Sequence, residues 1–247
     1  MKNSIKILFS LFIIFACISS CDKVTEYFDK DDTNNGGSSG NHVDNGDGTG
    51  ILTDKRDDKE YNTVKIGQQW WMAENLNVGT RVLLSDGQSG STGAEKYCYN
   101  DDESYCDIYG GLYNWYTVDD GVCPEGWHVP SEEEWQELEI FIGVPESEAR
   151  NIRSNRGTNH GGMLKETGLS HWKSPNKDAT NSTGFNALPA GSAGVNFQYI
   201  GEIAMFWTND YSGTNAADVR ALHFDEGYIS KFPYHINIGI SVRCVKN

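Results

Sequence analysis

Short apolar stretches separated by long polar ones characterise the chain from Ile51 to its end at Asn247. The apolar stretches have the length and composition of β-strands rather than of long helices. Between them lie Gly/Ser/Asn-rich segments, notably residues 85–93 and 154–162. Few regular elements and much loop predict an α+β domain, and the 197 residues involved suit a single domain. We expect strands at residues 62–66, 69–72, 201–208, 219–224 and 238–245.

One helix is well signalled. Ser131 can cap its N-terminus and Glu134, three residues later, completes a capping box. Apolar side chains recur at helical spacing from Trp135 onward, and Gly143 ends the pattern. A second, shorter helix is expected over residues 146–153.

The N-terminus has the features of an export signal. Lys2 and Lys6 form a positive region, and residues 7–14 form an almost unbroken apolar run that is too short to span a bilayer. Small residues at 18–20 then lead into Cys21. This arrangement resembles the lipobox of bacterial lipoproteins, which implies that Cys21 is lipidated and becomes the first residue of the mature chain. The alternative is a plain signal peptide followed by a chance cysteine.

Lipidation would place the protein on the membrane without a transmembrane helix, because two or three acyl chains give stable anchoring. We expect it on the bacterial outer membrane, at the cell surface. Removing residues 1–20 takes away two lysines and no acid, so the net charge changes from −15 to −17. Such a surface repels nucleic acid, so we expect no nucleic-acid partner.

Residues 22–50 contain six Gly, six Asp and only four apolar or aromatic side chains. A segment of this composition buries too little apolar surface to offset its ordering entropy. Residues 44–48 lack the alternating ligand spacing of an EF-hand, so we interpret them as linker. The expected organisation is therefore a signal peptide at 1–20, a lipidated cysteine and disordered tether at 21–50, and a domain at 51–247.

The cysteines after Cys21 are even in number, which in an exported chain indicates disulfides, with three possible pairings. Cys98 and Cys106 flank a short polar loop, which suits a bridge across a hairpin. Cys123 and Cys244 would then close a loop of about 120 residues, constraining the unfolded chain by roughly 4–5 kcal/mol. Zinc is the alternative, but the C-x₂-C spacing is absent and an oxidising compartment disfavours it.

Six motifs, in this order, resemble the Fibrobacter succinogenes major paralogous domain family of exported, often lipid-anchored bacterial proteins. The resemblance runs from about Thr53 to Val245. The motifs are YNTVKIG at 61–67, WWMAENLN at 70–77, YGGLYNW at 109–115, CPEGWHVPS at 123–131, GFNALPAG at 184–191 and SVRCV at 241–245.

The resemblance implies a C-type-lectin-like fold. Residues 127–135 look like the start of a helix in formylglycine-generating-enzyme-like domains, and residues 241–244 look like their final strand. In such folds the helix and the last strand are adjacent, which supports pairing Cys123 with Cys244. Those enzymes use a cysteine pair near the end of the domain. Only Cys244 lies there in this chain, so the resemblance argues against that activity.

The sequence favours a binding module over an enzyme. Its six histidines are scattered and no G-x-S-x-G or H-E-x-x-H motif is present, so we expect no catalytic residue and no cofactor. Twelve Tyr and seven Trp offer flat faces with polar rims, which suit an extracellular glycan or protein ligand. The alternative is a structural subunit of a surface assembly that uses the domain for protein interactions.

Four residues are candidate ligand contacts. Trp172 lies among polar neighbours and is expected to be exposed. Trp207, Asn209 and Asp210 belong to a stretch that resembles the W-N-D calcium and sugar motif of C-type lectins, with one inserted Thr. Calcium needs six to eight converging oxygens, and no partner tripeptide is present, so we expect no metal site.

Overall fold

The computed structural model describes residues 41–89, 93–151 and 155–247. The strands are mostly antiparallel and the helices are few and short, which confirms the α+β class. The largest sheet is antiparallel throughout. In spatial order it consists of β1 (His42–Asp44), β2 (Thr49–Asp54), β3 (Lys59–Ile66), β4 (Gln69–Met72), β13 (Val245–Lys246) and β7 (Trp127–His128).

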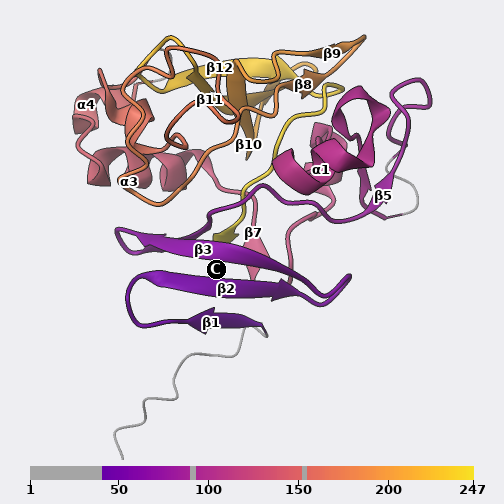
Figure 1. The fold of residues 1–247 in the computed structure, drawn as a ribbon, viewed down its shortest axis with the longest axis horizontal. Helices are drawn as coiled ribbons and strands as arrows, with labels where there is room; N and C mark the ends of the chain where they lie inside the picture. Colours follow the sequence, from indigo (N-terminus) through magenta and orange to yellow (C-terminus); the bar gives the residue numbers. More distant parts are fainter. Residues whose placement is uncertain (1–40, 90–92, 152–154) are drawn as a thin grey trace, which may run out of the picture. The chain divides into compact units, whose positions relative to one another are not determined.

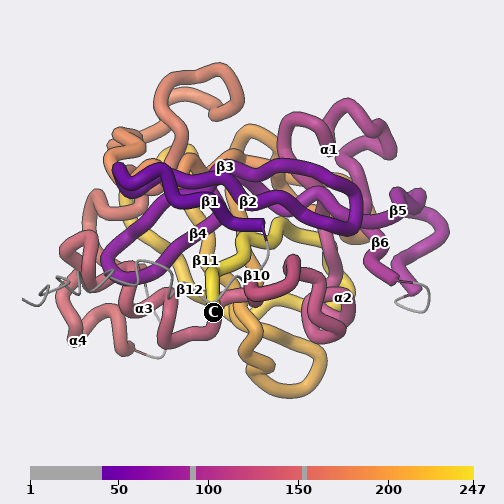
Figure 2. The backbone as a smooth tube through the Cα atoms, turned by 90° about the horizontal axis from the view of Figure 1, so that it is seen from below, coloured from indigo at the N-terminus to yellow at the C-terminus, as the bar shows by residue number. Residues whose placement is uncertain are grey.

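A second antiparallel sheet consists of β10 (Ile203–Gly213), β11 (Ala216–His223) and β12 (Ser230–His235). Two short pairs join β5 (Thr80–Arg81) to β6 (Glu95–Lys96) and β8 (Ser192–Ala193) to β9 (Phe197–Gln198). The helices are α1 (Glu103–Tyr109), α2 (Trp115–Asp119), α3 (Glu132–Phe141) and α4 (Glu146–Ala149), with 3₁₀ turns η1 (Tyr99–Asp101) and η2 (His160–Met163). Helices α3 and α4 lie beside the second sheet (Figure 1), and Figure 2 looks onto β1, β2 and β3.

The ordered domain begins earlier than residue 51, so the expected tether boundary is wrong for residues 41–50. Strand β1 pairs with β2, and the His42 ring contacts Trp70 at 4.7 Å and Trp127 at 5.3 Å between centroids. The intervening turn is held by Asp44 and Asp47, whose carboxylates accept backbone N–H groups two residues on. Backbone pairing and a histidine ring therefore order a segment that is poor in apolar side chains. The signal peptide, Cys21 and the rest of the expected tether lie outside the described residues.

Helix α3 forms where the sequence predicts it. Both hydrogen bonds of the capping box between Ser131 and Glu134 are present. The helix ends at Phe141, and Gly143 follows with φ = 106°. The following helix, α4, is shorter than expected and ends at Ala149.

Two large hydrophobic cores and one small core lie within the domain. The first core packs the large sheet and α2 against β10 and β11. Its members include Tyr61, Met72, Leu76, Tyr113, Trp115, Val118, Trp127, Trp207, Val219 and Val242. The second core lies under α3. Its members include Trp71, Trp135, Leu138, Trp172, Phe185, Phe206, Leu222 and Val245.

Residues 240–245 pass through the interior rather than forming the continuous strand expected at 238–245. Ile240 pairs with Tyr113, Ser241 with Phe206, and only Val245–Lys246 forms a strand. Arg243 is fully buried, and its guanidinium donates to the carbonyls of Met72, Phe185 and Asn186 and to the side chain of Asn75. The segment therefore links several surrounding loops instead of one neighbouring strand.

Both expected disulfides are present, Cys98–Cys106 and Cys123–Cys244. Their Cα atoms are 5.1 Å and 6.0 Å apart. The first bridge does not cross a hairpin, because Cys106 lies inside α1 and Cys98 precedes η1. The second fastens the segment before β7 to the residue before β13, which are neighbouring strands.

A buried ion cluster fixes α3 to the second sheet. Glu139 is fully buried, and its carboxylate lies 2.6 Å from Arg220 Nε and 3.4 Å from Arg156 Nε. Glu132 lies 2.9 Å from Arg220 Nη1 and 2.7 Å from Lys231 Nζ. We call these five residues the ion cluster. Charges this deep are tolerated because each one faces an opposite charge.

Candidate functional site

The two candidate tryptophans are buried. Trp172 is 2% exposed and its Nε1 donates to the Ala187 carbonyl at 3.1 Å, so the expected exposure is wrong. Trp207 is fully buried and its Nε1 donates to the Tyr113 carbonyl at 2.7 Å. Each indole serves a core, so neither presents a face to a ligand. The polar neighbours of Trp172 in sequence belong to a loop that turns this one side chain inward.

Asp210 acts as an additional cap of α3. Its Oδ2 accepts the backbone N–H of Glu132 at 2.6 Å, at the N-terminus of that helix. Burial raises the pKa of Asp210, and the neighbouring acids Glu133 and Glu132 raise it further. This capping role is reason enough for an aspartate at position 210.

Asn209 is exposed and lies at an irregularity of β10. The pairing with β11 shifts register between Trp207 and Tyr211, as at a β-bulge. The backbone N–H of Asn209 donates to the Pro130 carbonyl at 3.0 Å instead of to a strand neighbour. Of the four candidate residues, Asn209 is the one whose side chain lines a cavity.

We call this the Asn209 cavity, which has a volume of about 420 Å³. Two indoles, Trp115 and Trp127, line it beside Val118 and Val129, and these indoles are 8% and 5% exposed. Trp115 is fixed by its Nε1, which donates to the Thr208 carbonyl at 3.2 Å. Exposed Asp119 joins Asn209 at the rim.

His128 also lines the Asn209 cavity, but both of its ring nitrogens are engaged. Nε2 lies 2.8 Å from Glu134 and Nδ1 lies 2.5 Å from the side chain of Asn247. The hydrogen bond with Glu134 raises the pKa of His128 above its usual value, against the effect of burial. The ring therefore ties β7 to α3 and to the C-terminus, and offers no free base.

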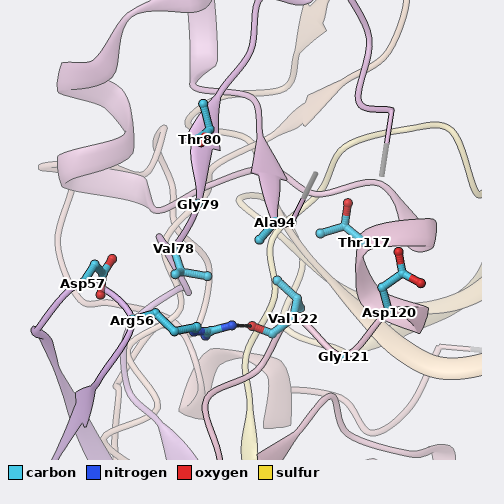
Figure 3. A pocket seen from close by; sticks show the side chains of 11 residues that line it. Arg56, Asp57, Val78, Gly79, Thr80, Ala94, Thr117, Asp120, Gly121 and Val122 are labelled. Carbon is cyan, nitrogen blue, oxygen red and sulfur yellow. Dashed lines mark hydrogen bonds between the residues drawn. The ribbon is translucent and has the colours of Figure 1, made fainter. Parts of the chain in front are cut away.

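A larger cavity of about 610 Å³ adjoins the first, because Gly121 lines both. We call it the Arg56 cavity (Figure 3). Arg56 is held by a bidentate contact with Asp54 and donates from Nη1 to the Val122 carbonyl at 2.8 Å. Figure 3 shows this guanidinium crossing the cavity toward Val122, with Asp57 on one side and Asp120 on the other. Each of residues 119–123 lines one cavity or the other, and Gly121 lines both.

Much of the Arg56 cavity is lined by small side chains and backbone. Val78, Ala94 and Thr117 line it, together with Gly79 and Gly121. Gly79 has φ = 99°, and a Cβ atom there would lie 2.2 Å from the Ala94 carbonyl oxygen. Only glycine at position 79 therefore allows β5 to pair with β6 at this side of the cavity.

Sequence reasoning does not identify Arg56, Thr117 or Asp120. The cavity brings together segments that are far apart in the chain, and no linear pattern connects them. One local signal exists: the Asp119-Asp120-Gly121 turn directly after α2 favours exposed carboxylates.

The arrangement suits recognition. Amide, carboxylate and guanidinium groups surround the two cavities, which is typical of sites that orient a polar ligand by hydrogen bonds. Three acids that follow Cys98 in sequence have other partners: Asp101 accepts the backbone N–H of Leu84, Asp102 caps α1 and Glu103 contacts Arg81. In the part of the chain that the structure describes, no group of three or more His, Cys, Asp or Glu side chains could hold a metal ion. Nor is any helix there long and apolar enough to cross a membrane.

Comparison with protein families gives one match. The family described as the Fibrobacter succinogenes major domain matches residues 64–246, more than half of the chain. Strands β1 and β2 precede the matched region, whereas both disulfides and most residues of the two cavities lie inside it. Searches among curated proteins and among solved structures find no match. The chain belongs to the Fibrobacter succinogenes major domain family.

Proposed function

We propose that the protein is a lipid-anchored, non-catalytic module that binds glycans at the outer surface of a bacterium. The observation that carries the proposal is the pair of adjoining cavities with Asn209, Asp119, Asp120 and Arg56 around them. Planar amide, carboxylate and guanidinium groups can each bond two neighbouring hydroxyls of a sugar. The indoles of Trp115 and Trp127 supply apolar surface for its C–H groups.

We also propose that the domain has a C-type-lectin-like architecture. Its first and last strands share one sheet, since β13 lies between β4 and β7. The Cys123–Cys244 bridge fastens that closure. Side chains of α3 and of β13 share the second core, which fits the helix and final strand that the family resemblance implies.

Charge narrows the class of ligand. The chain carries 35 acidic against 20 basic residues, and two acids, Asp57 and Asp120, line the Arg56 cavity against one arginine. An anionic polymer would be repelled, so the favoured ligand is an uncharged saccharide.

A glycan array of short neutral oligosaccharides tests the proposal. The full chain in detergent micelles should bind a subset of the array, and Asn209→Ala should weaken that binding by about tenfold, the loss of one or two good hydrogen bonds. Asn45→Ala, at the exposed turn between β1 and β2, is the matched control and should bind as the unmodified chain does. Equal binding by Asn209→Ala would remove the cavity from the proposal.

The anchor is tested separately. Palmitate labelling in cells should mark the unmodified chain and disappear in Cys21→Ala, because the thiol is the acceptor of the lipid. Label retained by that variant would contradict the anchor while leaving the binding domain unaffected.

A further inference from the structure

A row of aromatic rings crosses the surface beside α1, away from the two cavities. The ring centroids of Phe197 and Tyr99 are 5.2 Å apart, those of Tyr99 and Tyr105 are 5.5 Å apart, and those of Tyr105 and Tyr109 are 6.2 Å apart. His171 ends the row with its ring 5.5 Å from Tyr109. We call these five residues the tyrosine row. All five are partly exposed.

The row is assembled from three separate parts of the chain. Tyr99 belongs to η1, and Tyr105 and Tyr109 belong to α1. Phe197 belongs to the β8–β9 hairpin, and His171 to the loop between η2 and β8. Helix α1 and the hairpin lie on the same side of the domain (Figure 1). The planes of neighbouring rings from Phe197 to Tyr109 make angles of 45°, 42° and 18°, so no two neighbouring rings are perpendicular.

The rings are held rigidly from behind. Tyr99, Tyr109 and Phe197 pack against a small core formed by Tyr97, Leu112, Ala190 and Ala193. The Cys98–Cys106 disulfide lies directly beside two members of the row, because Tyr99 follows Cys98 and Tyr105 precedes Cys106. His171 is fixed by Glu166, whose carboxylate oxygens both lie 2.9 Å from Nδ1. Binding a ligand would therefore cost little further side-chain entropy, because folding already holds these rings in place.

The chemistry of the row favours one kind of occupant. Aromatic faces with hydroxyl rims match the alternating C–H faces and hydroxyl edges of pyranose rings. Acids lie beside the row, with exposed Asp102 and Asp107 on or next to α1 and Glu166 at the far end. Lys173, the cation beside Tyr99, is paired with Glu202. An anionic polymer would be repelled here too.

Building on the proposed glycan binding, we infer that the tyrosine row is a second glycan surface, which holds an extended chain of uncharged sugars. Ring spacings of 5.2–6.2 Å are comparable with the advance per sugar of an extended pyranose chain, so successive sugars can each meet an aromatic side chain. The cavities would hold a short saccharide, whereas the row would hold a polymer.

Affinity electrophoresis of the full chain in detergent tests the inference. The gels contain dextran, mixed-linkage β-glucan or mannan, with polygalacturonate as the anionic counterpart. At least one neutral polymer should retard the protein and polygalacturonate should not. Tyr105→Ala and Tyr109→Ala should each weaken the retardation by about tenfold, as the loss of one stacking partner implies.

Two variants separate stacking from damage to the fold. Tyr105→Phe keeps the ring and should retain most of the binding, whereas Tyr116→Ala removes an exposed tyrosine outside the row and should change nothing. Near-ultraviolet circular dichroism checks that each variant is folded.

The possible failures can be told apart. If no neutral polymer retards the protein, or if Tyr105→Ala and Tyr109→Ala bind as the unmodified chain does, the row is not a glycan surface. Oligosaccharide binding that depends on Asn209 would still support the cavities. If the tyrosine variants instead abolish self-association in sedimentation, the row joins two copies of the chain and the inference is wrong.

Discussion

The two cores of the domain are closed in different ways. The first core is fastened by the Cys123–Cys244 disulfide, and both cavities open at its edge, since Trp115, Val118, Trp127 and Val122 belong to it. The second core has no disulfide and is closed by the ion cluster beneath α3.

The difference shows how each device acts. A long-range disulfide destabilises the unfolded chain and makes few demands on packing nearby, so it suits a region that is hollowed for a ligand. A buried ion cluster stabilises the folded state only if every charge has its partner, so it requires close packing around a helix in one fixed position. The same comparison predicts how strongly each region responds to substitution.

The largest effect should come from the long disulfide. Cys123→Ser/Cys244→Ser removes a bridge across 121 residues and should lower the free energy of unfolding by about 5 kcal/mol. Cys98→Ser/Cys106→Ser removes a bridge across eight residues and should lower it by only about 2–3 kcal/mol. Urea unfolding of the two double variants measures both values, and a larger loss for the short bridge would contradict the chain-entropy explanation.

The second effect should come from the ion cluster. Arg220→Gln removes the charge that faces Glu139 and Glu132, and should lower the free energy of unfolding by about 3–4 kcal/mol. Arg156 and Lys231 remain to compensate in part. Glu137→Gln, at an exposed position on α3, is the control and should lose less than about 0.5 kcal/mol. Similar losses at the two positions would mean that the cluster does not hold α3.

The third effect is a loss of stability at low pH, which comes from Glu132. Burial alone would raise the pKa of Glu132, but Arg220 and Lys231 outweigh burial and lower it to about 2. The folded-state pKa lies below the ordinary value, so this stabilisation is complete above about pH 4.5 and is lost as the pH falls through about 2. Between pH 7 and pH 3 the loss should be about 2 kcal/mol.

Comparison with Glu132→Gln isolates this group from Glu139, whose pKa burial raises and whose contribution therefore changes in the opposite direction. The difference in urea midpoint between the unmodified chain and Glu132→Gln should shrink as the pH falls from 7 to 3. A constant difference would show that Glu132 carries no charge-dependent stability.

The smallest effect should come from His128, at the edge of the first core. Its hydrogen bond with Glu134 raises its pKa, so the stability it contributes is complete below about pH 6.5 and is lost as the pH rises through the raised value. Both partners are partly exposed, so the effect should stay below about 1 kcal/mol. His128→Gln should therefore lower the thermal midpoint more at pH 5.5 than at pH 8.5. The reverse order would contradict the assigned direction of the pKa.

Local signals in the sequence predicted local structure well. The capping box of α3 depends on Ser131 and Glu134 alone, and the disulfides depend on the even number of cysteines after Cys21. Helix α1 was missed because its cap, Asp102, precedes a polar segment whose single buried member is Cys106. Composition predicts a tether at residues 41–50, whereas the pairing of β1 with β2 and of β2 with β3, and the contacts of His42, order this segment.

The site was predictable only in part, for a related reason. Asn209 lies on a cavity, but the neighbouring motif residues Trp207 and Asp210 serve the core and a helix cap. The exposure of a side chain depends on the residues that it contacts in the fold. Trp172 contacts Ala187 and Lys165, neither of which is among its neighbours in sequence. The cavities themselves bring distant residues together: the lining of the Arg56 cavity runs from Arg56 to Val122, and the Asn209 cavity joins residues 115–129 to Asn209.

The central place of β13 sets an order of events for a chain that emerges N-terminus first. The largest sheet cannot close until Val245–Lys246 has emerged, because β13 lies between β4 and β7. Cys98 and Cys106 emerge before Cys123 and can pair at once, which leaves Cys123 to pair with Cys244. The native bridges therefore join these four cysteines in the order in which they appear. An oxidant that simply pairs each thiol with the next would yield the correct fold without reshuffling.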